Sequence, residues 1–223
     1  MTLTIAEGLV LLSLKNETGE KSGQFVEYGL AGSAIAELIL RGRLVLDQVK
    51  QKKLSVTDAA PTGDVFLDSC LETLAKRADG RSVKSAVSKL ANKSKLFRTQ
   101  AQALVDKGVL RADPQSFLFF NWTRYPEAEP KAEAKLILHL EAVMFEGKPP
   151  EAEDCVIIAL GDKTGLLKKN FPNEKLKAHK DRIKEIAKGG MASTKATIQA
   201  IEAVQVALVA SIAAASASSA SVS

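Results

Sequence analysis

The sequence predicts a mainly α-helical protein, a single-domain helical bundle with β-hairpins at its periphery. Leu, Ala, Lys and Glu dominate its 223 residues, whereas Gly and Pro number only 14 and 7, and such a composition favours helices. Apolar residues make up 46% and charged residues 26%, as in soluble globular proteins with a sizeable core. We expect the bundle to span residues 1–212 and an Ala/Ser-rich disordered tail to follow at 213–223.

Capping residues and turns locate the elements of the first half. Thr4 and Glu7 form a capping box that opens a helix to about Lys15. The segments 44–46 and 54–56 flank a basic tip containing Lys50, Lys52 and Lys53, which predicts a hairpin. Further helices are expected at 26–40, 65–76, 81–91 and 94–107. Asp64 should cap the helix at 65–76, and Gly108 should end the helix at 94–107. Small residues in the helix at 26–40 suggest close helix packing.

The second half is predicted to begin with an apolar hairpin at 109–124 and to continue as helices. The first of these helices should end near Phe145. The others should cover 151–160, 163–170, 173–188 and 194–212. The last one approaches the ~20 apolar residues of a membrane span. Gln199, Glu202 and Gln205 recur at spacing three and form one polar stripe, which favours a core helix of the bundle.

Two cysteines and the N-terminal segment indicate the compartment. Cys70 and Cys155 each lie in an apolar helical pattern, so a disulfide framework is not expected and a reducing environment fits. The N-terminal segment has no basic flank and carries Glu7 inside its apolar run, unlike a signal peptide. We therefore expect a cytoplasmic protein.

No pattern of catalytic residues emerges from the sequence. His139 lies in an apolar run, as a satisfied core or interface histidine would, and His179 lies among charged residues, as a surface residue would. Neither has a partner at metal-ligand spacing, and no nucleophile elbow or phosphate loop occurs. The sequence predicts no catalytic residue, metal or cofactor, and thus not an enzyme.

The apolar run Phe117, Leu118, Phe119 and Phe120, followed by Trp122, suggests a binding surface. A half-buried strand alternates apolar and polar residues, whereas here four apolar residues are consecutive. The preceding segment contains six basic and no acidic residues between positions 81 and 98: Arg81, Lys84, Lys89, Lys93, Lys95 and Arg98. With a net charge of +5, this combination suggests contact with an anionic phospholipid membrane.

Two alternatives remain open from the residues alone. A helix followed by a hairpin is compatible with a winged-helix-like module that binds nucleic acid or another protein, although the few aromatic residues disfavour stacking on single strands. In the other alternative, the Phe-rich hairpin pairs between copies in a homo-oligomer.

Several segments together resemble the Golgi phosphoprotein 3 family. They are LTIAE at 3–7 with LVLL at 9–12, ELILRGRL at 37–44, APTGD at 60–64 with Leu67 and Asp68, LVDKGVL at 104–110 and the hairpin FLFFNWTRYP at 117–126. Their order and spacing agree over about 3–125, and more loosely beyond. The resemblance implies a mostly helical domain that binds phosphatidylinositol 4-phosphate, associates peripherally with membranes and inserts an apolar hairpin. It also implies an adaptor for membrane-protein tails, on the cytosolic face of the Golgi in a eukaryote.

The resemblance transfers unevenly to individual residues. Phe117, Leu118, Phe119 and Phe120 stand where the family's inserting residues lie. Eukaryotic members bind the headgroup through a tryptophan and three arginines, and the corresponding positions here are Ser22, Ala31, Ser94 and Phe97. The neighbouring bases Arg98, Lys95, Lys93 and Lys21 are the candidate headgroup ligands. We therefore expect a compact, prokaryotic-type member without the long N-terminal extension of animal members.

Overall fold

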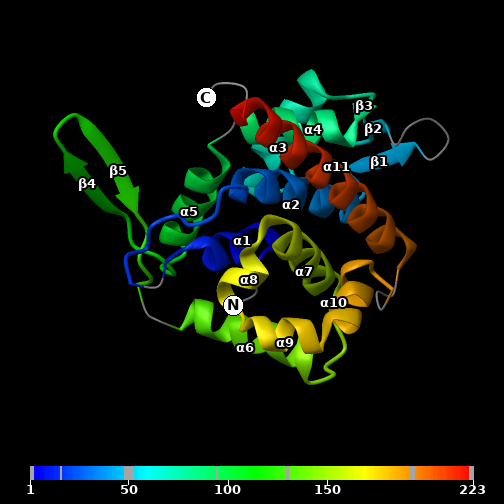
Figure 1. Cartoon of the computed structure of the whole chain (residues 1–223). Helices are drawn as coiled ribbons and strands as arrows, with labels where there is room; N and C mark the ends of the chain where they lie inside the picture. The colour runs from blue at the N-terminus through cyan, green and yellow to red at the C-terminus, as the bar shows by residue number, and fades with distance from the viewer. Residues whose placement is uncertain are drawn as a thin grey trace.

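Helix α2 (Val26–Leu40) runs through the centre of the molecule and is buried along most of its length. The computed structural model describes residues 3–15, 17–47, 53–93, 95–128, 131–190 and 194–220. Within these residues α2 packs against α1 (Ile5–Ser13), α4 (Val83–Lys93), α7 (Ala152–Thr164) and α11 (Lys195–Ala220) (Figure 1). The predicted mainly α fold, a helical bundle with peripheral hairpins, is confirmed.

Small residues allow the neighbouring helices to approach α2 closely. A Cβ atom at Gly32 would lie 3.1 Å from Leu160 Cδ2, and one at Gly29 would lie 3.0 Å from Thr164 Cγ2. Both distances are at or below the limit of ordinary contacts, so α7 could not sit as close against a larger side chain. The close packing that the sequence predicts for this helix is therefore confirmed.

Most predicted elements recur with bounds shifted by a few residues. The remaining helices are α3 (Val65–Arg77), α5 (Leu96–Asp106), α6 (Ala132–Phe145), α8 (Leu166–Asn170), α9 (Asn173–Ala178) and α10 (Lys180–Ala187). The Thr4 capping box of α1 is present, and Asp64 caps α3 by accepting the N–H groups of Phe66 and Leu67. Gly108 follows α5 with φ +72°, the left-handed conformation that ends helices.

Two hairpins lie at the periphery, as expected. Strands β1 (Leu44–Asp47) and β2 (Lys53–Val56) pair antiparallel, and the predicted basic tip lies outside the described residues except for Lys53. A third strand, β3 (Arg81–Ser82), joins β2 where the sequence predicts the start of a helix. The prediction was wrong there because Gly80, at φ +67°, turns the chain so that its N–H donates to the Leu54 carbonyl. Helix α4 begins only after this pairing.

Two further predictions need correction in the last quarter of the chain. The single helix expected at 173–188 is divided at His179 into α9 and α10. Helix α11 continues to Ala220, beyond the expected end at Ile212 and into the predicted tail. Alanine is the strongest helix former, and adding residues to an existing helix avoids the cost of nucleation.

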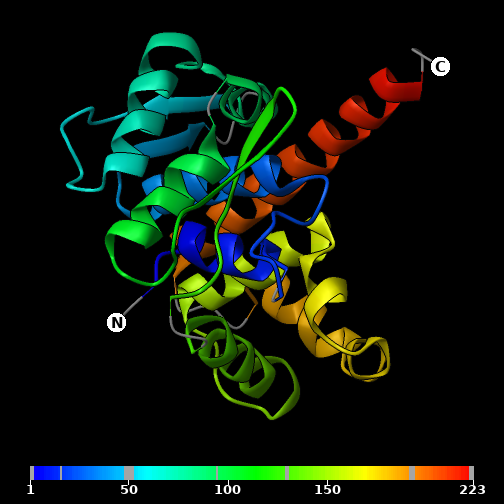
Figure 2. The ribbon, with the colours of Figure 1, turned by 90° about the vertical axis from the view of Figure 1, so that its left-hand side faces the viewer.

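The apolar helix α11 belongs to the bundle over its first half. Ile201, Val204 and Leu208 are fully buried against the helices that α11 contacts, namely α2, α4 and α7. Residues Ile198–Ala217 are long and apolar enough to cross a membrane by length and composition. Only 39% of this apolar stretch is buried inside the fold. The first half of α11 agrees with the core helix that the sequence favours, whereas its last turns extend away from the helical body (Figure 2).

Candidate functional site

The hairpin of β4 (Asp113–Phe117) and β5 (Phe120–Arg124) extends from the helical body as a separate arm (Figure 1). Phe117 pairs with Phe120, so Leu118 and Phe119 form a two-residue turn at the tip. The exposed fractions are 66% for Phe117, 77% for Leu118, 96% for Phe119 and 72% for Phe120. All four side chains predicted as the binding surface thus face solvent.

The turn carries a bulky residue where the backbone favours glycine. Leu118 is the only residue other than glycine with a positive φ in the described part of the chain, at +53°. A branched side chain in this conformation costs about 1–2 kcal/mol, and two-residue hairpin turns normally place Gly or Asn there. The hairpin therefore retains an apolar tip at the expense of its own stability.

Polar contacts anchor the base of the arm to the loop between α1 and α2. Glu20 Oε1 accepts from Arg124 Nε at 3.1 Å and from Nη2 at 2.9 Å. Lys15 donates to the other oxygen of the same carboxylate, and this hydrogen bond, together with Arg124, holds the pKa of Glu20 below its usual value. The Tyr125 N–H donates to the Gly19 carbonyl at 2.8 Å.

Gly19 is required at this base by both space and backbone conformation. Its φ is +65°, and a Cβ atom there would lie 2.2 Å from the Pro126 nitrogen. The Tyr125 ring is buried and meets the Phe97 ring edge-on, with 5.9 Å between centroids. The base of the arm is therefore packed directly against the first turn of α5.

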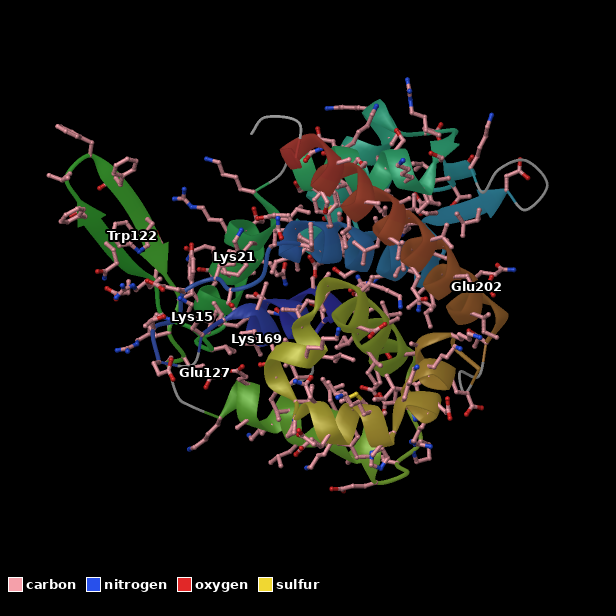
Figure 3. All side chains as sticks on the ribbon, viewed as in Figure 1. Lys15, Lys21, Trp122, Glu127, Lys169 and Glu202 are labelled. Atoms are coloured by element: carbon pink, nitrogen blue, oxygen red, sulfur yellow. The ribbon has the colours of Figure 1, made fainter. Side chains whose placement is uncertain are left out.

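Three of the four predicted headgroup ligands lie near this first turn. Lys95 is the N-cap residue of α5, and both Lys95 and Arg98 are exposed. Lys21 Nζ lies 5.4 Å from the centre of the Phe97 ring; Figure 3 shows Lys15 and Lys21 beside the hairpin base and Trp122 on the arm. The Lys93 side chain lies outside the described residues. We call Lys21, Lys95 and Arg98 the basic surface.

Two of the positions compared with eukaryotic headgroup ligands lie in the interior. Ala31 is fully buried, and Phe97 is 7% exposed; Ser94 is outside the described residues. The interior location explains why these two positions carry apolar side chains. The cations of this chain come instead from the loop before α2 and from the exposed side of α5.

Sequence reasoning missed the residues that hold the arm in place. Gly19 reads only as a helix stop, and Glu20 and Arg124 are 104 residues apart, so no local pattern connects them. Glu27 also lies at the basic surface, because its carboxylate accepts the Phe97 N–H at 3.2 Å. An acidic residue in the first turn of a helix was the only signal for Glu27.

A groove of about 1030 Å³ lies among α1, α2, α6 and α7. His139 lines it, with Nε2 at 2.8 Å from Asp154 Oδ1 and Nδ1 at 3.0 Å from Lys148 Nζ. His139 is half-buried at the groove rather than in the core, and both of its ring nitrogens have partners. No group of three or more potential metal-binding side chains occurs among the described residues.

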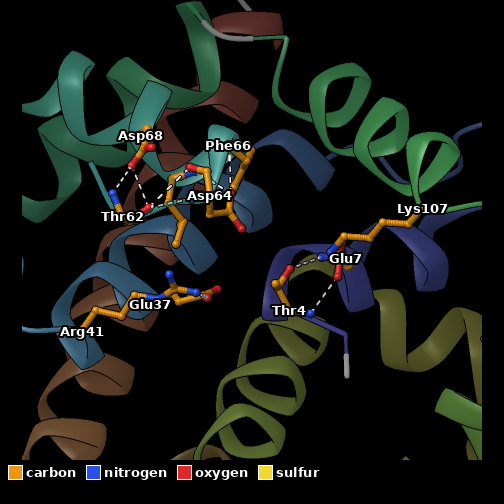
Figure 4. Close-up of polar contacts among 10 residues, drawn as sticks. Thr4, Glu7, Glu37, Arg41, Thr62, Asp64, Phe66, Asp68 and Lys107 are labelled. Atoms are coloured by element: carbon orange, nitrogen blue, oxygen red, sulfur yellow. Dashed lines mark hydrogen bonds and ion pairs between the residues drawn. The ribbon is translucent and has the colours of Figure 1, made fainter. Parts of the chain in front are cut away.

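Many residues in the motifs that carry the family resemblance stabilise the fold. Glu7 accepts the Thr4 N–H and pairs with Lys107 of the LVDKGVL segment (Figure 4). Asp68 accepts from the N–H and the hydroxyl of Thr62, which holds the pKa of Asp68 below its usual value. Glu37 pairs with Arg41 at 2.5 Å, yet burial raises the pKa of Glu37.

The fold and site define a mainly α protein that presents an apolar β-hairpin beside a basic surface. A family model described as Golgi phosphoprotein 3 matches residues 5–208. The chain belongs to the Golgi phosphoprotein 3 family. It is also 30% identical over 149 residues to vacuolar protein sorting-associated protein 74 of Eremothecium gossypii, an alignment that covers 57% of this chain and 45% of that relative. The match thus spans less than half the length of the curated relative.

Proposed function

We propose that this protein attaches peripherally to anionic phospholipid membranes by inserting the tip of the β4–β5 hairpin. The observation that carries the proposal is the exposure of four consecutive apolar side chains at the end of an anchored arm. Fully burying a Phe or Leu side chain contributes ~1.5–3 kcal/mol. Partial insertion of all four therefore favours the membrane by several such increments, before ordering costs are subtracted.

The basic surface supplies the second part of the attachment. A Lys or Arg close to an anionic leaflet contributes ~1 kcal/mol, and salt screens this attraction. Lys21, Lys95 and Arg98 lie near the packed base of the arm, so they would meet lipid headgroups while the tip enters the acyl region. Two weak signals together give reversible attachment, as they do for lipid anchors.

The family suggests the finer features of this function. By similarity, the lipid would be phosphatidylinositol 4-phosphate, the protein would act as an adaptor for membrane-protein tails, and it would act by binding rather than by catalysis. Its location would be cytoplasmic and membrane-associated, on the cytosolic face of the Golgi if the source is a eukaryote. The name of the relative, vacuolar protein sorting-associated protein 74, supports the adaptor role.

Co-sedimentation with phosphatidylcholine vesicles containing an anionic lipid tests the proposal. The wild type should sediment with the vesicles at low salt and less at high salt. The Phe119→Ser/Phe120→Ser variant should remain in the supernatant. Val65→Ser is the matched control, because Val65 is 81% exposed on α3, outside the arm, and its replacement should leave binding unchanged.

Three results would contradict the proposal. They are a wild type that ignores anionic vesicles, a double variant that binds as well as the wild type, and binding to duplex DNA that survives the double substitution. If the wild type is a dimer in size-exclusion chromatography, Phe119→Ser is a monomer and neither binds vesicles, the hairpin would instead form an interface between copies.

A further inference from the structure

The C-terminal half of α11 leaves the helical body (Figure 2). A contact with α4 holds it as it leaves, because the hydroxyl oxygens of Ser211 and Ser88 lie 3.3 Å apart. Ile212 still packs against the core. Four of the residues that follow are exposed, namely Ala213, Ala214, Ser216 and Ala217. The helix thus continues past the core on side chains that face solvent.

The exposed part of α11 is apolar and uncharged. Val206 is 61% exposed and Val209 is 50% exposed, and no Asp, Glu, Lys or Arg occurs between positions 203 and 220. A helix that is apolar all round is normally buried in a protein core or in a membrane. In a protein with 26% charged residues, an uncharged and exposed helix end of this length indicates contact with an apolar phase.

The hydroxyl group of Ser216 does not depend on water for a partner. It donates to the Ile212 carbonyl at 3.0 Å, one turn earlier in the same helix. Serine hydroxyls that bond to the preceding turn are compatible with apolar surroundings, because they leave no polar group unsatisfied there. The end of α11 can therefore enter a lipid phase without a large penalty from this side chain.

The end of α11 and the tip of the β4–β5 hairpin project on the same side of the molecule. Both lie at the top of Figure 1 and again at the top of Figure 2, which is turned by 90° about the vertical axis. Helix α6 lies at the bottom of both views. A bilayer that receives the hairpin tip is thus on the side toward which α11 points.

We propose that the end of α11, from Val209 to Ala217, is a second contact with the lipid bilayer. The inference rests on the proposed function and extends it: one arm alone leaves the protein free to tilt on the membrane, whereas two separate contacts fix its orientation. The helix end enters the interfacial region, as membrane-surface helices do. A second copy of the chain would also cover the valines, but only the bilayer accounts for the direction shared with the hairpin tip.

A solvent-sensitive fluorophore on single introduced cysteines tests this inference. Cys70 and Cys155 are buried, so a thiol reagent applied to the folded protein labels the introduced residue selectively. On addition of phosphatidylcholine/phosphatidylglycerol vesicles, the emission of labelled Phe119→Cys and of labelled Ala213→Cys should shift to the blue. The control Leu138→Cys should show no shift, because Leu138 is 65% exposed on α6, at the opposite side of the molecule.

Sedimentation of unlabelled protein with the same vesicles gives a second measurement. The Val209→Gln/Ala213→Gln variant exchanges two apolar side chains for a good helix former whose amide opposes insertion. Its affinity for the vesicles should fall about tenfold, with an unchanged helix content by circular dichroism. Leu138→Gln is the matched control and should bind as the wild type does.

The outcomes separate this inference from the proposed function. If the Phe119→Cys label responds to vesicles and the Ala213→Cys label does not, the inference is overturned and the proposed function stands. The same holds if the double Gln variant binds vesicles as tightly as the wild type, or if it only converts a dimer into monomers in size-exclusion chromatography. A wild type that does not sediment, with no response from either label, would overturn both.

Discussion

The ammonium of Lys107 lies 2.5 Å from the carboxylate of Glu7, which joins the C-terminal end of α5 to the first turn of α1 (Figure 4). The Glu7 side chain is 1% exposed, whereas that of Lys107 is 40% exposed. The same carboxylate accepts the Thr4 N–H at 2.9 Å. One buried negative charge therefore depends on a cation that reaches it from the surface, immediately before the chain enters the hairpin.

Removal of that cation should destabilise the whole fold. Lys107→Met leaves the Glu7 charge buried without its ion-pair partner, and we expect a loss of about 3 kcal/mol in the free energy of unfolding. Lys76→Met on the exposed Glu72–Lys76 pair is the control, with a much smaller expected loss because solvent screens this pair. Urea unfolding monitored by circular dichroism measures both, and equal losses would contradict the role of Glu7 burial.

Leu118 in the hairpin turn should lower the stability of the fold while it adds apolar surface to the tip. Leu118→Gly removes the cost of a positive φ but increases the entropy of the unfolded chain, so we expect a net gain of about 0.5 kcal/mol. Leu118→Ala keeps the strain and should give no gain. Both variants should bind anionic vesicles more weakly than the wild type. Thermal unfolding and vesicle sedimentation of the three proteins test these expectations together.

Gly19 should tolerate no side chain. Gly19→Ala forces a Cβ atom against the backbone of Pro126 and should cost about 3 kcal/mol or more through strain and displacement of the hairpin base. Gly80→Ala is a matched control, since Gly80 has φ +67° with nothing within 4 Å of the added atom. It should cost about 1 kcal/mol. A similar loss in both variants, measured by urea unfolding, would show that conformation alone matters.

Glu133 should make stability depend on pH in the direction opposite to ordinary acid unfolding. Its Oε1 is buried without a hydrogen-bond partner among the described residues, and burial raises the pKa of Glu133 above the usual 4.5. The folded state therefore binds this proton more tightly than the unfolded chain. Its contribution to stability is fully present below pH 4.5 and is lost as the pH rises through the folded pKa.

The Glu133→Gln variant should remove this contribution to the pH dependence. Because Gln is neutral at every pH, the variant should exceed the wild type in stability at neutral pH, and the difference should shrink on acidification. Glu146→Gln, at an exposed position after α6, should follow the wild-type profile. A profile of melting temperature against pH measures this, and a Glu133→Gln curve parallel to the wild type would refute it.

Both cysteines should be unreactive in the folded protein. Burial raises the pKa of Cys70 to about 12 and the pKa of Cys155 to about 11, and only a thiolate is an effective nucleophile. A colourimetric thiol reagent at mildly alkaline pH should detect almost no thiol before denaturant is added and two per chain afterwards. Rapid reaction of either residue without denaturant would show that the packing around it opens.

Local patterns predicted those parts of the molecule that depend on neighbouring residues. The bounds of α2 agree with the sequence because a run of small and apolar residues defines this helix, and the capping box of α1 agrees because Thr4 and Glu7 define it locally. The apolar binding surface was also foreseeable, because the four consecutive apolar residues from Phe117 to Phe120 do not fit the alternation of a half-buried strand. The family resemblance added the expectation of one mostly helical domain with a protruding apolar hairpin, which periodicity alone does not provide.

Contacts between distant segments account for what the sequence did not reveal. Strand β3 forms because Arg81 and Ser82 pair with β2. Two residues are too few to show a strand pattern in the sequence. The role of Glu27 depends on Phe97, 70 residues further along the chain. Likewise, Lys21 lies near Lys95 and Arg98 because its ammonium lies over the Phe97 ring in the first turn of α5.

The outward position of Phe119 has a practical consequence for handling the protein. A ring that is 96% exposed is not covered by other side chains of its own chain. Concentrated solutions of the protein should therefore aggregate in the absence of lipid or detergent. The proposed bilayer attachment and an association between copies would need the same few rings, so the two would exclude one another. A mild detergent should disperse such aggregates and should also compete with vesicles for the hairpin tip. A detergent titration therefore measures the affinity of this tip for an apolar phase.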